Sequence, residues 1–292
     1  MAAVLVIALG ACSMLRLGYS QGPELLYWWL DGYADFSQEQ SPRVREALAD
    51  AFRWHRREQL PGIADQLAQL RSEVAQPTDA QAVCRWQDVV RTRMDAVTTQ
   101  VLPGALELAA TLSPAQLRQV EREQTKKNAE FRDKHLQRDL DERRAGQLKR
   151  GVERAEMLYG RLDSAQRERI ARALQASPYD GQAWLAEREA RQQLVLRTLR
   201  GLNNRSLDVA AARTALQPLT TQQALRPDYR DELRRVTQYN CQWMAELHNS
   251  TTPAQRQAAQ ERLSGWESDL RALVGSGSRV AAQAPTAVPP AR

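Results

Sequence analysis

The sequence predicts an all-α protein, a bundle of unequal helical hairpins with long amphipathic helices and no β-sheet. Three observations support this prediction. A pattern typical of helix starts recurs along the chain, and apolar residues follow it at intervals of three and four. No run of alternating polar and apolar residues bounded by hairpin turns occurs anywhere.

The recurring helix start has the form of a capping box. The side chain of a Ser, Thr or Asp accepts a hydrogen bond from the backbone amide three residues later. The side chain of a Gln at that later position accepts a hydrogen bond from the backbone amide of the capping residue. The four boxes are Ser37 to Gln40, Ser113 to Gln116, Asp163 to Gln166 and Thr252 to Gln255. Their unequal separations argue against a solenoid with one fixed period.

Two further helices are predicted from apolar stripes that we expect to face the core. The first stripe is Val83, Trp86, Val90, Met94, Val97 and Val101, and the second is Leu233, Val236, Trp243 and Leu247. Cys84 and Cys241 lie near the edges of these stripes, so antiparallel packing could bring the thiols together. The polar stretch 116–159 favours a long projecting hairpin.

The composition is that of a folded domain with enough residues for a sizeable core. The chain has 292 residues, of which 42% are hydrophobic and 26% charged, and its formal net charge is +6. A basic excess can indicate nucleic acid, but here acidic residues are interleaved with the basic ones, which is typical of solvated helix faces. We therefore expect no nucleic-acid partner.

The first residues have the features of a bacterial lipoprotein signal. Residues 1–11 are uncharged and apolar but too few to span a bilayer. The run ends in Leu9-Gly10-Ala11-Cys12, which resembles a lipobox, although the positive charge that usually opens such signals is absent. The resemblance implies a signal peptide over 1–11 and a lipid on Cys12. The alternative is a short buried helix that happens to contain a cysteine.

The remaining organisation follows from this interpretation. We expect a lipidated tether over 12–22, an all-helical periplasmic domain over 23–274, and a disordered Gly/Ser/Ala/Pro tail over 275–292. Ser13 in place of Asp after the lipidated cysteine favours the outer membrane over the inner one. In an oxidising compartment, Cys84 and Cys241 are either a disulfide or two separately buried thiols.

Two aromatic segments each allow two interpretations. The run Tyr27-Trp28-Trp29 forms either an interfacial anchor beside the lipid or a short helix packed on the domain. Trp54, His55, Arg56 and Arg57 form either a binding patch near Pro61 or a packed turn whose arginines pair with neighbouring acids.

The sequence offers little support for catalysis. The three histidines have no metal-ligand spacing, and neither a Gly-x-Ser-x-Gly elbow nor a phosphate-binding glycine loop is present. We therefore expect no metal, no cofactor, no catalytic residue and no enzymatic activity. If the protein were a helical cell-wall hydrolase, Glu267, between Trp266 and Ser268, would be the candidate catalytic carboxylate. Such an enzyme needs two carboxylates that face each other, and the sequence shows no such pair.

Several segments carry family resemblances. Cys12-Ser13, the Tyr27-Trp28-Trp29-Leu30-Asp31 run, and Trp54-His55-Arg56-Arg57 before Leu60-Pro61 together resemble an uncharacterised family of proteobacterial lipoproteins. That resemblance implies location and a helical fold but no activity. The boxes also resemble the LTxxQ motif of Spy and CpxP type periplasmic proteins, a likeness that shared capping chemistry would equally produce.

The function expected from these features is that of a bacterial envelope lipoprotein, a non-enzymatic binding or scaffold module with chaperone-like behaviour. Its partners would be the membrane, through Cys12, and an envelope protein or the cell wall. The alternative function is a helical peptidoglycan hydrolase.

Overall fold

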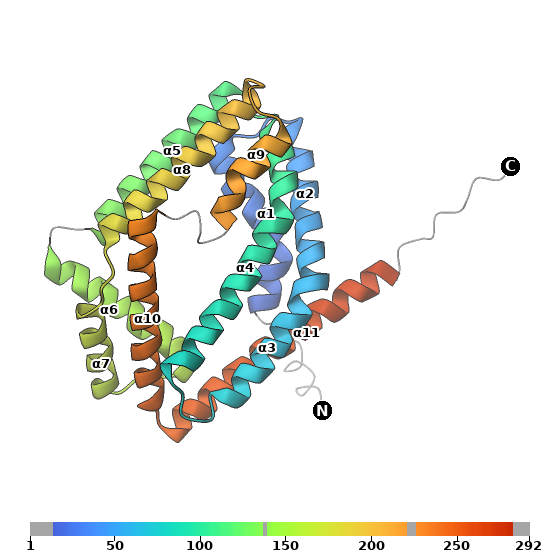
Figure 1. Cartoon of the computed structure of the whole chain (residues 1–292). Coiled ribbons are helices and arrows are strands. Elements are labelled where there is room, and N and C mark those ends of the chain that lie inside the picture. Colours follow the sequence, from blue (N-terminus) through green and yellow to red (C-terminus); the bar gives the residue numbers. More distant parts are fainter. Residues whose placement is uncertain (1–13, 137–138, 221–225, 283–292) are drawn as a thin grey trace, which may run out of the picture.

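Every regular element that the structure describes is helical, as predicted (Figure 1). The computed structural model describes residues 14–136, 139–220 and 226–282. The helices are α1 (Met14–Ala34), α2 (Gln40–Trp54), the π-helical η2 (His55–Gln59), α3 (Leu60–Glu73), α4 (Ala80–Ala109), α5 (Pro114–His135), α6 (Leu140–Tyr159), α7 (Ser164–Gln175), α8 (Gly181–Asn203), α9 (Val209–Leu216), the 3-10 helix η3 (Gln217–Thr220), α10 (Pro227–Asn249) and α11 (Pro253–Ala282). None of these helices is long and apolar enough to cross a membrane.

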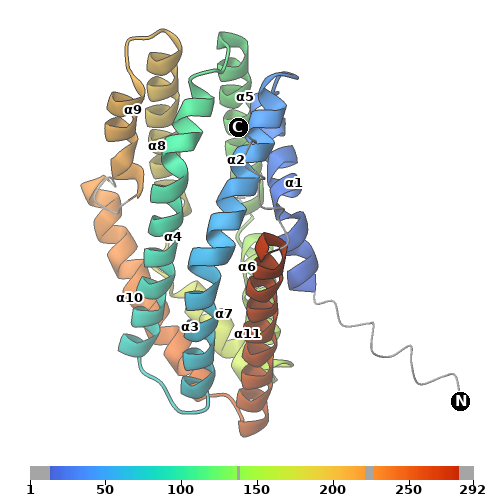
Figure 2. The same cartoon turned by 90° about the vertical axis from the view of Figure 1, so that its right-hand side faces the viewer.

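The helices pack in pairs. α3 lies along α11, α5 along α8, α1 along α2, and α6 against α7 (Figures 1 and 2). α4 runs from the end of α3 to the start of α5 and contacts α10 on the way (Figure 1). The polar stretch 116–159 is therefore no projecting hairpin, because its two helices pack on different partners.

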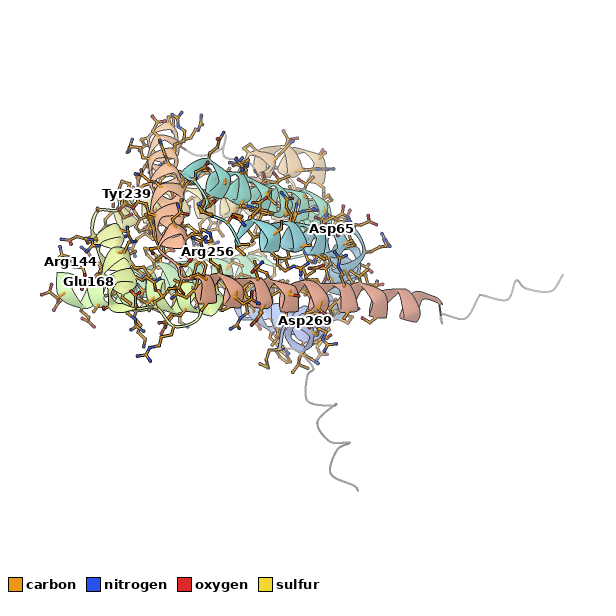
Figure 3. The ribbon with its side chains drawn as sticks, turned by 90° about the horizontal axis from the view of Figure 1, so that it is seen from below. Asp65, Arg144, Glu168, Tyr239, Arg256 and Asp269 are labelled. Atoms are coloured by element: carbon orange, nitrogen blue, oxygen red, sulfur yellow. A yellow bond between two sulfur atoms is a disulfide. The ribbon has the colours of Figure 1, made fainter. Side chains whose placement is uncertain are left out.

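Buried apolar side chains form separate clusters, some within a helix pair and some between pairs, rather than one central core. The largest includes Leu106 of α4, Leu117 of α5 and Leu199 of α8. Others lie between α3 and α11, between α1 and α2, and where α6 and α7 meet α10. Ion pairs add to these contacts. Arg16 of α1 lies 3.2 Å from Asp269 of α11, and within the α3–α11 pair Arg271 lies 3.0 Å from Asp65; Figure 3 labels the two aspartates.

All four capping boxes form the reciprocal bonds that their pattern predicts. The backbone amide of each Gln donates to the cap oxygen, at 3.3, 3.2, 2.8 and 3.2 Å in chain order. Each cap amide donates to the Oε1 of its Gln, at 3.0, 2.8, 3.1 and 2.9 Å. The starts of α5, α7 and α11 are thus set by local sequence, and the box at Ser37 forms in the turn that leads into α2, which begins at Gln40.

The boxes also meet in pairs, which the sequence pattern does not reveal. Nε2 of Gln116 donates to Oε1 of Gln40 at 2.7 Å, and the reverse bond measures 3.4 Å. Nε2 of Gln40 also donates to the carbonyl of Thr111 at 2.9 Å, and Nε2 of Gln116 to that of Asp35 at 2.8 Å. Both carbonyls lie two residues before the partner's cap, so the pair has local twofold symmetry.

The other two boxes repeat this arrangement between the starts of α7 and α11. Gln166 and Gln255 exchange amide bonds of 2.8 and 2.9 Å. Gln166 donates to the carbonyl of Ser250 at 3.0 Å, and Gln255 to that of Arg161 at 2.9 Å. Each pair therefore caps two helices and joins two loops far apart in sequence.

A disulfide links Cys84 on α4 to Cys241 on α10, with 5.4 Å between the Cα atoms. The two helices run in opposite directions (Figure 1), as the stripe argument required. Cys241 is fully buried, and the bond closes a loop of 157 residues.

The apolar stripe on α4 does not face the core along its whole length, contrary to the prediction. Val90 and Met94 are each 61% exposed. The first turns of α4 pack on α10 near Cys84, and its last turns pack on α2 and α9. In the middle of this long helix Arg93 donates to the side chains of Gln59 and Gln66, and Val90 and Met94 lie on the outward side.

Two predicted boundaries differ from the structure. The tether expected over 12–22 is helical from Met14, because Arg16 and Tyr19 attach this stretch to the bundle through Asp269 and His55. The disordered tail expected over 275–292 is helical to Ala282, since prolines begin only at residue 285. Residues 1–13, with the predicted signal peptide and Cys12, and residues 283–292 lie outside the described residues.

Candidate functional site

A groove of about 870 Å³ lies between α6, α7 and α10, and we call it the α6–α10 groove. Its apolar surface comes from spacings of three and four along two helices. α10 supplies Val236, Trp243, Met244 and Leu247, and α6 supplies Leu158. Leu247 is buried, whereas the flexible thioether of Met244 is exposed within the groove. The groove therefore offers an apolar contact surface with an adaptable side chain.

Arginines line the α6 side of the groove. Arg143, Arg150 and Arg154 share one helix face with Gln147, and Arg144 adjoins them. Arg144 lies 3.8 Å from exposed Asp141. Within the described residues, the other three form no ion pair with an acidic side chain.

Acidic groups scarcely offset this positive charge. Asp180 is the one acidic side chain that lines the groove in the described part of the chain. Its Oδ1 accepts a bond of 2.8 Å from the amide of Gln182, where it caps α8. Burial, Arg150 and Lys134 together lower the pKa of His135 at the groove wall, so His135 is neutral at neutral pH. Burial raises the pKa of Tyr179 to about 12, which keeps its phenol protonated.

The four arginines were missed in the sequence analysis. Positions 143, 147, 150 and 154 fall on one helix face, a signal visible in the printed sequence. That signal could have indicated a basic face, but nothing in the sequence indicates that α10 lies opposite it. The groove walls come from segments more than 70 residues apart, and only folding brings them together.

The predicted patch Trp54 to Arg57 lies at η2, where the chain passes into Pro61 at the start of α3. His55 Nδ1 lies 3.0 Å from the hydroxyl of Tyr19 on α1, and burial lowers the pKa of His55. The guanidinium of Arg56 lies over the Tyr19 ring at 5.4 Å. His55 and Arg56 therefore pack under α1.

The rest of the patch is also accounted for by neighbouring groups. Arg57 is exposed and lies 2.7 Å from adjacent Glu58, and Trp54 is half-buried beside His55. The packed-turn interpretation therefore describes this segment best.

His248 joins three segments near the end of α10. Its Nε2 lies 2.8 Å from the carbonyl of Gln76, to which it donates, and its Nδ1 accepts from the hydroxyl of Tyr159 at 2.9 Å. Burial lowers the pKa of His248, and nearby Arg256 lowers it further. The bond to Gln76 needs a proton on Nε2 and the bond from Tyr159 needs an unprotonated Nδ1, so the two bonds together fit the neutral ring with its proton on Nε2.

We expect the folded chain to lose stability as the pH falls through about 6.5, the pKa of histidine in the unfolded chain. Below that pH the unfolded chain takes up protons that the folded chain, with its lowered histidine pKa values, does not. The loss deepens until the pH reaches the folded pKa. Urea unfolding curves between about pH 7.5 and pH 5.5 measure it.

Replacing His248 should reduce this pH dependence. His248→Gln keeps a donor for the carbonyl of Gln76 but cannot titrate, so its stability should change less with pH than that of wild type. A His135→Gln variant, compared by the same urea curves, removes another histidine with a lowered pKa but breaks neither of the two bonds of His248. An unchanged pH profile for His248→Gln would show that this ring does not contribute.

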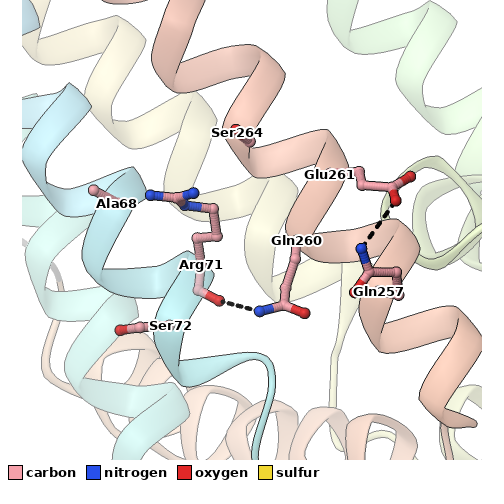
Figure 4. Close-up of a pocket in the computed structure, with 7 residues that line it drawn as sticks. All are labelled: Ala68, Arg71, Ser72, Gln257, Gln260, Glu261 and Ser264. Carbon is pink, nitrogen blue, oxygen red and sulfur yellow. Dashed lines mark hydrogen bonds between the residues drawn. The ribbon is translucent and has the colours of Figure 1, made fainter.

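Two other grooves are smaller. One of about 450 Å³ lies between α3 and α11, where Gln260 donates to the carbonyl of Arg71 and Gln257 to Glu261 (Figure 4). The other, of about 380 Å³, is lined by Trp184 and Glu187, whose carboxylate pairs with Arg226. Each has one acidic side chain in its lining.

Neither groove is lined by the facing pair of carboxylates that the hydrolase alternative needs. Glu267 lies 3.4 Å from Arg71 and 3.0 Å from Arg271, so its charge is balanced. In the described ranges, no three His, Cys, Asp or Glu side chains gather as a metal site would need.

A family of unknown function, DUF6279, matches residues 32–230, which is more than half of the chain. The chain belongs to the DUF6279 family. The matched part of this DUF6279 protein contains three of the four capping boxes and the arginine face of α6, and it ends inside α10 before the apolar wall of the groove. No curated protein and no solved structure is significantly similar to the chain.

Proposed function

We propose that this protein is a lipid-anchored module of the bacterial envelope that binds a partner polypeptide without enzymatic activity. The α6–α10 groove is its binding site, and the partner segment combines apolar with acidic side chains. One observation carries this proposal: an apolar surface borders three arginines that no acidic side chain of the described residues neutralises.

The chemistry of the groove matches this class of partner. Its volume lies within the range of about 300 to 1,000 Å³ usual for binding sites. Apolar side chains of a partner would displace water from Val236, Met244 and Leu247. Carboxylates would accept charge-assisted bonds from the arginines of α6, which are stronger than bonds between neutral groups.

The proposed anchor is supported by the sequence before α1. An uncharged apolar run ends in Leu9-Gly10-Ala11-Cys12, which resembles a lipobox and lies two residues before the helix begins. The Cys84–Cys241 disulfide suits an oxidising compartment such as the periplasm. The intact mass of the mature protein tests the anchor, since acylation at Cys12 adds a mass that an unmodified product lacks.

Binding of a defined peptide tests the groove. The probe is a fluorescent amphipathic peptide with Leu on one helical face and Glu on the other. We expect it to bind wild type and to bind Arg150→Gln/Arg154→Gln roughly tenfold more weakly, a loss of about 1.4 kcal/mol. Fluorescence anisotropy with the full chain measures both affinities.

Two controls separate the groove from general charge attraction. Arg43→Gln/Arg53→Gln removes the same charge from α2 and should leave binding unchanged. A peptide with Lys in place of every Glu should bind wild type weakly. Equal binding of the two peptides, or equal losses in the two double variants, would contradict the proposal.

A further inference from the structure

One face of α1 is apolar and exposed. Met14, Leu17, Leu25, Trp28 and Trp29 are each between 53% and 82% exposed. With Gln21 they lie at intervals of three and four, so they form a single stripe along the helix. We call these residues the α1 stripe.

The rest of α1 is fixed to the bundle, which holds the α1 stripe outward. Tyr27 is buried and donates to Ser41 Oγ at 2.9 Å, and Leu26 and Leu30 pack in the same cluster with Val44. In the segment Tyr27-Trp28-Trp29, the tyrosine therefore packs on the domain, whereas both tryptophans are exposed.

The charged residues of α1 have partners. Arg16 pairs with Asp269, and Asp31 Oδ1 accepts a bond of 2.9 Å from the amide of Phe36. Glu24 lies at the edge of the stripe, four residues before Trp28, and pairs with Arg45 of α2. An apolar environment would therefore meet a neutralised ion pair at the edge of the stripe and not an unpaired charge.

We infer that the α1 stripe lies on the surface of a phospholipid bilayer as a second membrane contact. The inference rests on the proposed envelope location. Residues 1–12, an apolar run and the predicted lipid site, join the stripe at Met14. Any attachment of that segment to a bilayer brings the start of α1 to the same surface. Trp side chains favour the headgroup level.

The dimensions of the stripe favour a bilayer over a second copy of the chain. A helix of 21 residues is about 32 Å long, so a stripe about 10 Å wide covers on the order of 300 Å². A stable protein interface needs about 800 Å² on each side. Because α1 is not apolar enough to cross a membrane, it would lie in the plane of the interface.

Quenching by bromine tests this contact. The full chain is reconstituted in vesicles of phosphatidylethanolamine and phosphatidylglycerol whose acyl chains carry bromine, and its Trp emission is compared with that in unbrominated vesicles. We expect strong quenching for wild type. Trp28→Gln/Trp29→Gln should lose most of the quenchable emission, because the other five tryptophans of the chain lie on helices other than α1. They are Trp54, Trp86, Trp184, Trp243 and Trp266.

A second variant keeps the fluorophores. Leu17→Gln/Leu25→Gln removes apolar contact while both tryptophans remain, so quenching should fall at least twofold. Val90→Gln/Met94→Gln changes an equally exposed apolar pair on α4 and should have no effect. Helix content measured by circular dichroism confirms that each variant is folded.

Two outcomes would overturn the inference. One is equal quenching of wild type and Trp28→Gln/Trp29→Gln. The other is a wild-type dimer that the same substitutions dissociate, which would assign the stripe to a second copy. Neither outcome depends on the peptide affinity of the groove or on the mass of residue 12, so the proposed function can fail separately.

Discussion

Removing the Cys84–Cys241 disulfide is expected to destabilise the fold by roughly 2 to 5 kcal/mol. The bond closes a loop of 157 residues, and a crosslink over so long a loop removes much conformational freedom from the unfolded chain. Because the clusters of the core are separate, the link between α4 and α10 has few substitutes. The midpoint of thermal unfolding should fall by roughly 5 to 15 °C.

Two forms of the protein isolate the effect of the crosslink. Chemical reduction of wild type keeps both sulfur atoms and breaks only the bond, whereas Cys84→Ala/Cys241→Ala also shortens a fully buried side chain. Reduced wild type should therefore unfold at a temperature between those of the oxidised protein and the double variant. The double variant should not respond to reductant. A reductant that leaves the wild-type midpoint unchanged would contradict the prediction.

Replacing Gln166 is expected to cost more than replacing any other glutamine of the capping boxes. Gln166 is 2% exposed, and Gln166→Leu removes its bonds to Asp163, Ser250 and Gln255. Polar groups would then be buried without partners, at about 1 to 3 kcal/mol for each one that water cannot reach. We expect a total loss of about 2 to 4 kcal/mol by urea unfolding.

The substitution Gln166→Glu separates the local cap from the long-range pair. A capping box accepts Glu or Gln at this position, because either can accept from the cap amide. The carboxylate cannot donate to the carbonyl of Ser250, so the structure predicts that Gln166→Glu is destabilising. If Gln166→Glu is as stable as wild type, the long-range bond contributes nothing.

A double-mutant cycle measures the pair itself. Gln166→Leu/Gln255→Leu should cost less than the two single changes added together, by about 0.5 to 3 kcal/mol. The same cycle on Gln40 and Gln116, neither of which is buried as Gln166 is, should give a smaller coupling. Additive costs at Gln166 and Gln255 would show that the two boxes act only as separate caps.

Helix starts were predictable because their causes are local. A capping box satisfies the amides of one turn with side chains from that same turn, so Ser113 and Gln116 specify the start of α5 wherever it packs. The all-α class follows from the same short-range periodicity. Errors arose where neighbours decided the outcome: Met94 follows a core-like spacing yet lies outside, since no other helix packs over it in the described part of the chain.

The α6–α10 groove likewise combines a local feature with one that depends on folding. The spacing of the arginines predicts a basic face on α6. That face borders a groove only because Trp243 and Leu247 lie opposite it, on a helix some 90 residues later. Likewise, adjacent tryptophans in α1 allow two interpretations until Tyr27 is seen to be buried.

The helical class, the capping boxes and the two cysteines available for a crosslink can all be recognised in the amino-acid pattern. Three features follow only from the folded arrangement: which boxes meet, the distance of 5.4 Å between the Cα atoms of the two cysteines, and which apolar faces remain uncovered. The physical reason is range. Capping and periodicity act within a few residues, whereas burial and pairing depend on contacts between segments that the chain brings together only when it folds.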